Sequence, residues 1–293
     1  MPLKKTGRVI GVIDKKLSSG VLKATDLPDI SKRIRGDLVE MSHTADAMHL
    51  GSSLSCVDIF VALYHGGYLN IDPADPASLT RDRVILSKGH ASMTLYSILA
   101  DKGFFPKDLL RSFNKTGSLL TEHPNKGALP GIEATSGSLG HGLPIGLGMA
   151  VAGRLHHLPY RVFVIMSDGE CNEGSVWEAA MLAPAQKIQN LVVIIDFNRW
   201  QATGRSEEVM ALNPLKEKWE SFGWSAYEVD GHDTKALTEK ISRIPDGSGK
   251  PVVIIAHTVK GKGVSFMEDD NNWHYRVPNE DEVRRAKEEL GLL

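Results

Sequence analysis

Residues 162–204 read VFVIMSDGECNEGSVWEAAMLAPAQKIQNLVVIIDFNRWQATG. Within this stretch an apolar run ends at Asp168-Gly169, a helix-length segment follows, and a second apolar run ends at Asn198. Runs that are apolar throughout are typical of parallel strands covered on both faces. Parallel strands end at the same edge of their sheet, so Asp168 and Asn198 are expected to lie close together. The order strand, helix, strand indicates an α/β protein.

The same alternation continues on both sides of this stretch. Strands are predicted at residues 83–86, 162–166, 191–195, 224–229 and 252–256, and helices at 30–47, 53–64, 92–102, 143–155, 175–187, 214–222 and 234–244. Such alternation predicts a doubly wound, mostly parallel sheet with helices on both faces. We expect an N-terminal arm over 1–28, one domain over 29–263, and a C-terminal arm over 264–293 with a charged helix at 278–290.

Composition excludes several classes of function. The 293 residues are 42% apolar, and 34 Lys plus Arg nearly balance 36 Asp plus Glu. Because the chain has almost no net charge, neither nucleic acid nor a membrane surface is an expected partner. No apolar run approaches the roughly 18 residues of a membrane span, and no signal-peptide core begins the chain, so a cytoplasmic location is expected. Cys56 and Cys171 are expected to be small core residues, because two cysteines make no disulfide framework or metal cluster.

The two strand ends offer oxygen ligands. Asp168 supplies a carboxylate, Asn198 an amide oxygen and Trp200 a backbone carbonyl. These ligands favour Mg²⁺, Ca²⁺ or Mn²⁺ over Zn²⁺, and they leave positions for diphosphate oxygens and water. Gly169 allows the backbone to approach a phosphate, and the helix that begins near residue 175 presents free N–H groups. We therefore predict a metal-diphosphate site.

A glycine-rich turn at residues 135–142 is a second candidate site. Its spacing matches neither a Walker loop nor the dinucleotide fingerprint. A phosphate cradle and close helix packing are equally good explanations for Gly137 to Gly142. For Gly146 and Gly148 in the following helix, packing is the preferred explanation.

Four histidines, His49, His90, His123 and His274, lie in segments punctuated by Gly or Pro. Loop histidines are more often functional than core ones, although each of these taken singly also suits a structural or exposed position. Lys260-Gly261-Lys262-Gly263 follows a predicted strand. That segment suits either a phosphate contact or a solvated basic turn.

Taken in order, these motifs resemble the amino-terminal half of the thiamine-diphosphate-dependent transketolases. Residues 167–198 are similar to the family's Gly-Asp-Gly to Asn motif, 48–55 to Gly-His-Pro-Gly-Gly-Ser-Leu-Ser, and 86–91 to Leu-Ser-Lys-Gly-His-Ala. Residues 122–142 resemble Gly-His-Pro followed by Pro-Gly-Val-Glu and Thr-Gly-Ser-Leu-Gly-Gln-Gly. The resemblance covers about residues 30–278 and implies the thiamine-diphosphate-binding fold, in particular its diphosphate domain.

The resemblance also implies roles for single residues. The divalent ion would be bound by Asp168, Asn198 and the Trp200 carbonyl, and Glu173 would lie at a contact between subunits. The residues implied to bind thiamine diphosphate are His90, Gly137, Leu139, Asp168, Gly169, Glu173, Asn198 and His274, and those implied to be catalytic are His49, His90, His123 and His274.

Three positions depart from the family pattern. Ser167 replaces the first motif glycine, Leu50 replaces a proline, and His141 stands where glutamine is usual. The change at Ser167 is expected to spare the metal site, because the ligand is Asp168. The changes at Leu50 and His141 leave the sugar substrate open, including modified or sulfonated ketoses.

Transketolases bind the aminopyrimidine ring in a second domain, whose glutamate activates the cofactor. About thirty residues follow the expected diphosphate domain here, whereas another α/β domain needs roughly 100. We therefore expect half an active site: the N-terminal subunit of a two-chain transketolase, completed by a C-terminal subunit with the pyrimidine domain and the glutamate, in an A2B2 heterotetramer. It would transfer a two-carbon ketol unit from a ketose, phosphorylated or otherwise modified, to an aldose.

Two alternatives stay open at this point. The α-subunit of a 2-oxo acid dehydrogenase carries a similar metal-diphosphate motif, although residues 86–90 and 122–124 argue against it. A non-catalytic module that binds thiamine diphosphate is the other.

Overall fold

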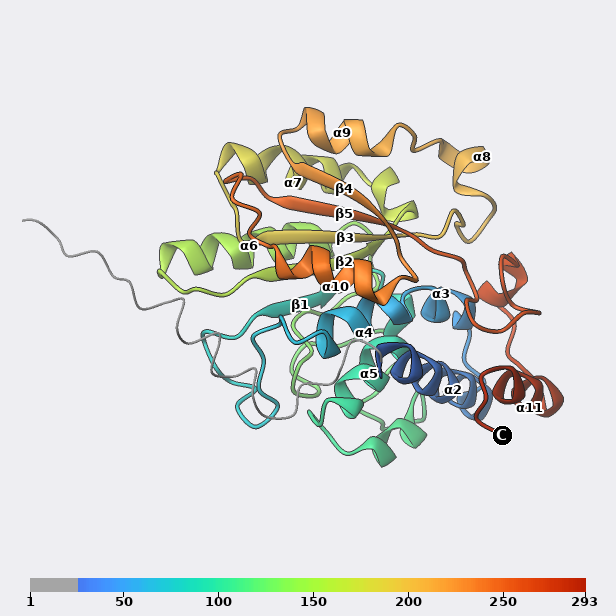
Figure 1. Cartoon of the computed structure of the whole chain (residues 1–293). Coiled ribbons are helices and arrows are strands. Elements are labelled where there is room, and N and C mark those ends of the chain that lie inside the picture. Colours follow the sequence, from blue (N-terminus) through green and yellow to red (C-terminus); the bar gives the residue numbers. More distant parts are fainter. Residues whose placement is uncertain (1–25) are drawn as a thin grey trace, which may run out of the picture.

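The computed structural model describes residues 26–293, so most of the expected N-terminal arm (1–28) lies outside the described residues. Its centre is one five-stranded sheet in the order β1-β2-β3-β5-β4 (Figure 1). All four neighbouring pairs of strands are parallel. The strands are β1 (Arg83–Leu86), β2 (Val162–Ser167), β3 (Leu191–Phe197), β4 (Ser225–Asp230) and β5 (Val252–His257). All five predicted strands are confirmed, with ends that shift by at most two residues.

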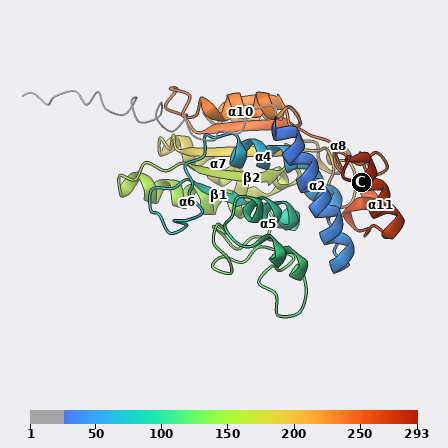
Figure 2. The same cartoon turned by 60° about the horizontal axis from the view of Figure 1, so that its bottom comes forward.

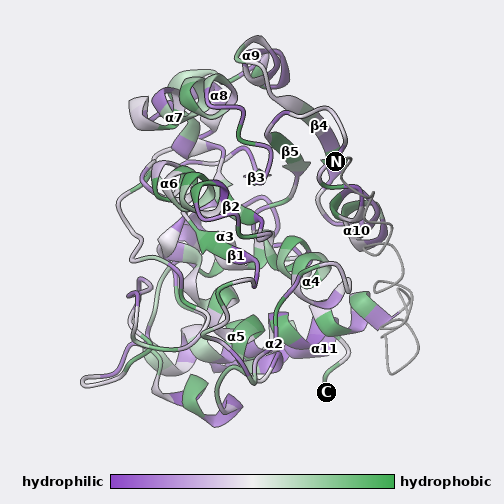
Figure 3. Ribbon diagram, turned by 90° about the vertical axis from the view of Figure 1, so that its left-hand side faces the viewer, coloured by the Kyte–Doolittle hydropathy of each residue, from purple (hydrophilic) through white to green (hydrophobic). Residues whose placement is uncertain are grey.

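Helices cover both faces of the sheet, as Figure 3 shows from one end. One layer holds α6 (Gly142–Leu155), α7 (Gly174–Ala185) and α9 (Leu215–Ser221). The other holds α2 (Leu27–Ala45), α3 (Leu50–Ser55), α4 (Val57–His65), α5 (Ser92–Asp101) and α10 (Thr234–Ser242). Shorter helices are η2 (Gly89–Ala91), η3 (Lys107–Ser112), η4 (Gly169–Asn172), α8 (Ser206–Met210) and η5 (Asn271–His274).

The apolar strands supply two cores at once. Phe163 and Ile165 of β2 belong to the cluster under α2, α4 and α5, whereas Val162 and Val164 belong to the cluster under α6 and α7. Successive side chains of a strand point to opposite faces, so a strand covered on both sides needs an apolar residue at every position. The predicted doubly wound fold follows from this pattern.

Two predicted helices differ in the structure. The single helix expected at 53–64 is two helices, because Cys56 leaves helical geometry between α3 and α4. The charged terminal helix is α11 (Glu280–Glu289), which begins with a capping box between Asn279 and Glu282. It lies beside α2 (Figure 2), and its Ala286 is part of the main core. The boundary placed at residue 263 stays a prediction. Cys56 and Cys171 are both buried and free, as expected of core residues.

A buried charged group joins α2 and α4 to the loop after β4. Asp58 binds Arg35 through both carboxylate oxygens, at 3.2 and 2.5 Å, and lies 2.8 Å from His232 Nδ1. His232 Nε2 accepts the Val259 N–H at 2.8 Å, so the proton of the neutral ring is on Nδ1 and is donated to Asp58. Burial alone would raise the pKa of Asp58, but the His232 hydrogen bond and the Arg35 charge outweigh it and lower the pKa to about 2.

Asp58→Asn is expected to lower the free energy of unfolding by about 3 kcal/mol at pH 7, because Arg35 would keep a buried charge without a counterion. Because the folded-state pKa lies below the usual 3.8, this stabilisation is present above pH 4 and disappears as the pH falls from 3.8 towards 2. Urea denaturation at a series of pH values measures both effects. A loss below about 0.5 kcal/mol at pH 7 would contradict the expectation.

Candidate active site at the carboxyl ends of the strands

Three neighbouring strands, β1, β2 and β3, end at one cavity, and Lys260 after β5 contacts its His274 wall. Lys88 to His90 follow β1, Asp168 to Glu173 follow β2, Asn198 to Trp200 follow β3, and Lys260 follows β5. The cavity has a volume of about 430 Å³. Ten of the eleven predicted site residues line it, namely His49, His90, His123, Gly137, Leu139, Gly169, Glu173, Asn198, Trp200 and His274. The eleventh, Asp168, is fully buried between Ser167 and Gly169, which are both in the cavity wall.

Asp168 has one satisfied and one unsatisfied oxygen. Its Oδ2 accepts hydrogen bonds from the Arg199 N–H at 3.0 Å and the Ser206 hydroxyl at 2.7 Å. Its Oδ1 is buried without a hydrogen-bond partner. Burial raises the pKa of Asp168 to about 7, although the Ser206 hydrogen bond opposes that change. A buried carboxylate oxygen of this kind is costly unless a cation binds it, so the carboxylate fits the predicted metal.

The orientation of the Asn198 side chain is fixed by buried Asp196, a role that the sequence pattern did not reveal. Asn198 Nδ2 donates to Asp196 Oδ2 at 3.2 Å, and Lys88 Nζ donates to the same oxygen. The side chains of Lys88 and Asp196 are both fully buried. Burial alone would raise the pKa of Asp196, but Lys88 keeps the pKa below its usual value. The amide nitrogen is thereby committed to Asp196. Asn198 Oδ1 accepts the Trp200 N–H at 3.0 Å and keeps a second lone pair for a ligand.

The four predicted histidines form one cluster. Ring centroids lie 4.9 Å apart for His49 and His274, 5.4 Å for His49 and His90, 5.7 Å for His90 and His274, and 6.2 Å for His49 and His123. His49 Nδ1 is 3.2 Å from Glu122 Oε1, without hydrogen-bond geometry. Segments more than 200 residues apart thus bring their imidazoles to a single wall.

Three of these rings, those of His90, His274 and His49, are held neutral. Burial, together with the neighbouring charge of Lys88, lowers the pKa of His90 well below its usual value. Burial and Lys260 lower the pKa of His274 to about 3. Burial is also the largest cause that lowers the pKa of His49. Neutral imidazoles can both accept and donate protons, as acid–base chemistry requires.

Lys260 is buried, so the solvated basic turn is wrong for this residue. Its Nζ donates to Asn271 Oδ1 at 2.7 Å and lies 3.2 Å from His274 Nδ1. Burial, and then Lys88, lower the pKa of Lys260 to about 8. The protonated ammonium group of lysine has no acceptor, so His274 Nδ1 is the acceptor and the proton of the neutral ring is on Nε2.

The glycine-rich turn is both a cavity wall and a close contact. Gly137 has φ +139°, and a Cβ there would lie 2.9 Å from the His123 ring. Glu170, which sequence reasoning missed, is buried and accepts hydrogen bonds from Gly140 N at 2.9 Å, Ser167 N at 2.9 Å and Ser87 Oγ at 2.6 Å. Close helix packing is confirmed as the explanation for Gly146, where an added Cβ would lie 2.5 Å from the Val164 side chain. The same explanation is wrong for Gly148, where an added Cβ would meet no atom within 4 Å.

The three departures from the family pattern lie in different environments. Ser167 is in the cavity wall, and its N–H is held by Glu170. Leu50 is fully buried in α3. His141 is exposed at the start of α6, where its Nδ1 lies 3.1 Å from the Leu139 carbonyl. Leu50 and His141 are therefore not among the residues that line the cavity.

A family model described as "Transketolase, thiamine diphosphate binding domain" matches residues 29–293. The chain belongs to the transketolase family. This transketolase chain is 40% identical to a subunit of the apulose-4-phosphate transketolase of Phocaeicola vulgatus, over 89% of its length and 92% of the relative's. It is also 40% identical to the 6-deoxy-6-sulfo-D-fructose transketolase subunit SqwG of a Clostridium species, over 83% and 88%.

Solved transketolases share the fold. The Campylobacter jejuni enzyme matches 92% of this chain with a TM-score of 0.86 and 27% identity. The chain spans only 43% of that enzyme and a similar share of the transketolase from Pichia stipitis. The predicted fold class, the thiamine diphosphate domain and the identity as the N-terminal subunit of a two-chain transketolase are confirmed. The α-subunit of a 2-oxo acid dehydrogenase receives no support from these relatives.

Proposed function

We propose that this transketolase subunit binds thiamine diphosphate through a divalent cation and moves a two-carbon ketol unit from a modified ketose to an aldose. The observation that carries the proposal is one cavity that brings the unpartnered oxygen of Asp168 beside four clustered histidines. When bound, thiamine diphosphate supplies the carbon nucleophile for this chemistry. The chain's own residues bind, orient and exchange protons.

The metal ligands are proposed to be Asp168 Oδ1, Asn198 Oδ1 and the Trp200 carbonyl, with Mg²⁺, Ca²⁺ or Mn²⁺ as the ion. An all-oxygen set of this kind suits hard cations. Within residues 26–293 no group of three His, Cys, Asp or Glu residues has the geometry of a metal site, which agrees with a set that contains a single carboxylate. Gly169 lies in the cavity wall, where its lack of a side chain allows a phosphate to approach the backbone.

The histidines are proposed to handle the sugar and the phosphate. His90 would donate a hydrogen bond to a phosphate oxygen, and the ammonium group of Lys260 would offset part of the phosphate charge. His274 would donate from Nε2 to a substrate oxygen, because Lys260 occupies its Nδ1. His49 and His123 would bind hydroxyl groups and accept or return the proton that moves during carbon–carbon bond cleavage and formation. Gly137 and Leu139 would line the middle of the cofactor.

The partner subunit is proposed to cover the open side of the cavity. Glu173 and Leu139 are exposed there. The neighbouring helices α6 and α7 expose the apolar side chains of Ile145, Met181 and Leu182. Exposed apolar side chains that gather next to a site are typical of protein interfaces. A C-terminal subunit with the pyrimidine domain and its activating glutamate would complete the site, in an A2B2 heterotetramer.

The substrate class is proposed from the relatives of similar length. One is named for apulose-4-phosphate and another for 6-deoxy-6-sulfo-D-fructose, both of which are ketoses with an anionic group. We propose a ketose phosphate or a sulfonated ketose as the donor. No helix in the described part of the chain is long and apolar enough to cross a bilayer. We propose that the enzyme acts in the cytoplasm.

The chain purified alone is expected to show no ketol transfer with thiamine diphosphate and Mg²⁺, because the activating glutamate belongs to the partner. Native purification followed by mass spectrometry identifies the co-eluting chain. The pair is then assayed with phosphorylated and sulfonated ketoses and, as a control for the dehydrogenase class, with 2-oxo acids. Robust turnover by the chain alone would refute the proposal that it carries only half of the active site. Decarboxylation of 2-oxo acids without ketol transfer would refute the proposed ketose substrates.

A further inference from the structure

Residues 198–206 form a short hairpin that carries most of the proposed metal ligands. Trp200 and Arg205 pair as an antiparallel bridge, and the Gln201 N–H donates to the Gly204 carbonyl at 2.9 Å. Asn198 and Trp200 stand at the start of the hairpin, and Ser206 at its end binds Asp168. The conformation of this hairpin therefore decides whether the ligands converge.

Asp269 holds one side of the hairpin. Its carboxylate accepts the Trp200 indole N–H at 2.8 Å and both terminal nitrogens of Arg205 at 2.6 Å each. The Arg205 guanidinium also stacks 3.7 Å from the centre of the Trp200 ring. The two strands of the hairpin are thus bound to one carboxylate, and the indole is fixed beside the carbonyl proposed as a ligand.

Asn271 holds the tip of the hairpin and connects it to the histidine wall. Its Nδ2 donates to the Ala202 carbonyl at 3.1 Å, while its Oδ1 accepts from Lys260 Nζ at 2.7 Å. Lys260 in turn contacts His274, and the Asp269 N–H donates to the Lys260 carbonyl at 2.8 Å. The segment from Lys260 to His274 therefore joins the hairpin to the buried amine and to the imidazole.

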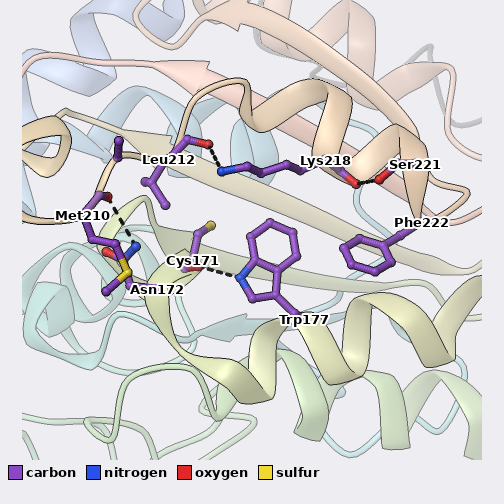
Figure 4. Close-up of a pocket in the computed structure, with 9 residues that line it drawn as sticks. Cys171, Asn172, Trp177, Met210, Leu212, Lys218, Ser221 and Phe222 are labelled. Carbon is purple, nitrogen blue, oxygen red and sulfur yellow. Dashed lines mark hydrogen bonds between the residues drawn. The ribbon is translucent and has the colours of Figure 1, made fainter.

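The other side of the hairpin is tied to the turn after β2. Gln201 Nε2 donates to Asn172 Oδ1 at 2.6 Å. Asn172 Nδ2 in turn lies 3.4 Å from the Met210 carbonyl, a contact that is drawn in Figure 4. Asn172 ends the η4 turn that begins next to Asp168. Side-chain hydrogen bonds thus brace the hairpin on both sides.

We propose that Asp269 and Asn271 are positioning residues that hold the 198–206 hairpin ready for the metal and the cofactor before either arrives. A hairpin fixed in advance does not have to be ordered on binding, so its conformational entropy does not reduce the affinity. Through Asn271, the position of the hairpin also affects the positions of Lys260 and His274. This inference rests on the metal ligands proposed above.

If Asp269 and Arg205 only stabilised the fold, removing their contacts would lower the stability of the whole domain. The Asp269 side chain is 54% exposed and that of Arg205 35% exposed, and such surface ion pairs contribute little to global stability. Loss of these contacts should therefore loosen the hairpin without unfolding the domain.

The test uses the full chain with Asp269→Gly and Asp269→Asn. Asp269 has φ +59°, a conformation that glycine and asparagine both accept, so neither variant adds backbone strain. Glycine removes all three hydrogen bonds, whereas asparagine keeps an acceptor. Glu40→Gln is the matched control, because Glu40 is 55% exposed and pairs with Lys287, on α11. Asn271→Ala tests the second brace.

Hydrogen–deuterium exchange of residues 199–206 in the unliganded chain is the first measurement. Calorimetric titration of thiamine diphosphate at saturating Mg²⁺ is the second. Asp269→Gly should speed the exchange about tenfold and weaken binding about tenfold. Asp269→Asn should fall between Asp269→Gly and wild type, Asn271→Ala should loosen the same hairpin, and Glu40→Gln should match wild type. The melting temperature of the unliganded chain should stay within about 2 °C.

Wild-type exchange in the hairpin of Asp269→Gly, or wild-type affinity of that variant, would overturn the proposal. A large drop in melting temperature would also overturn it, by assigning the contacts to global stability. A wrong assignment of the metal ligands gives a separate result: Asp168→Asn would then leave the calorimetric titration of thiamine diphosphate unchanged. The hydrogen–deuterium exchange of the hairpin is measured without ligand, so it tests the positioning role independently.

Discussion

Asp168→Ala is expected to weaken Mg²⁺-dependent binding of thiamine diphosphate by at least about 100-fold, more than the usual loss from a residue that only supports a metal ligand. Asp168 contributes the one negative charge of the proposed ligand set. Its Oδ1 is buried without a hydrogen-bond partner, so it is not engaged by another group of the described chain and is available to a cation. Isothermal titration of the full chain with thiamine diphosphate, with and without Mg²⁺, measures the loss.

Asp168→Asn distinguishes the loss of the carboxylate charge from a loss of folding. Asparagine has the same shape, and one oxygen can still accept from Arg199 N and Ser206, which hold Oδ2 in the wild type. We expect this variant to fold with wild-type circular dichroism and still to lose most of the Mg²⁺-dependent affinity. Unchanged binding in both variants would remove Asp168 from the metal site.

His123→Ala and His90→Ala are expected to lower the kcat of ketol transfer by about 10²- to 10⁴-fold in the complex with the partner, the range typical of lost acid–base groups. Both rings belong to the cluster around His49. His90→Ala should also weaken cofactor binding, because its ring is proposed to contact phosphate, whereas His123→Ala should not.

Steady-state assays at saturating cofactor, with separate titrations of thiamine diphosphate, distinguish these effects. His156→Ala is the control, because His156 is exposed at the end of α6, outside the cavity. If either variant retained kcat within about fivefold of the control, the catalytic role of that histidine would be wrong.

Much of the site could be predicted from the sequence because its residues follow apolar strands directly. Asp168 and Asn198 each stand one residue beyond a strand, and parallel strands bring such residues to one edge. Glycine-punctuated segments marked the four histidines. The roles of these residues in binding and catalysis are predictions, whereas their convergence on one cavity is a property of the structure.

The supporting residues could not be found in the same way. Lys88 and Asp196 are 108 residues apart, and neither has a local signal that names the other. Glu170 carries no sequence signal of its own, yet it is buried and accepts a hydrogen bond from the N–H of Gly140 in the glycine-rich turn. The sequence suits Lys260 both to a solvated turn and to a phosphate contact; its burial excludes the solvated turn, and the phosphate contact stays a prediction.

The sequence by itself determined the layers of the fold, the edge of the sheet where the candidate site lies, and the family. These follow from apolar periodicity and from motifs that are local along the chain. Only the tertiary structure decided which oxygen of Asp168 is unpartnered, which nitrogen of His274 carries its proton, and how Asp269 holds the 198–206 hairpin. Each of those depends on the pairing of polar groups from distant segments, and pairing inside a fold is set by geometry that the order of residues does not display.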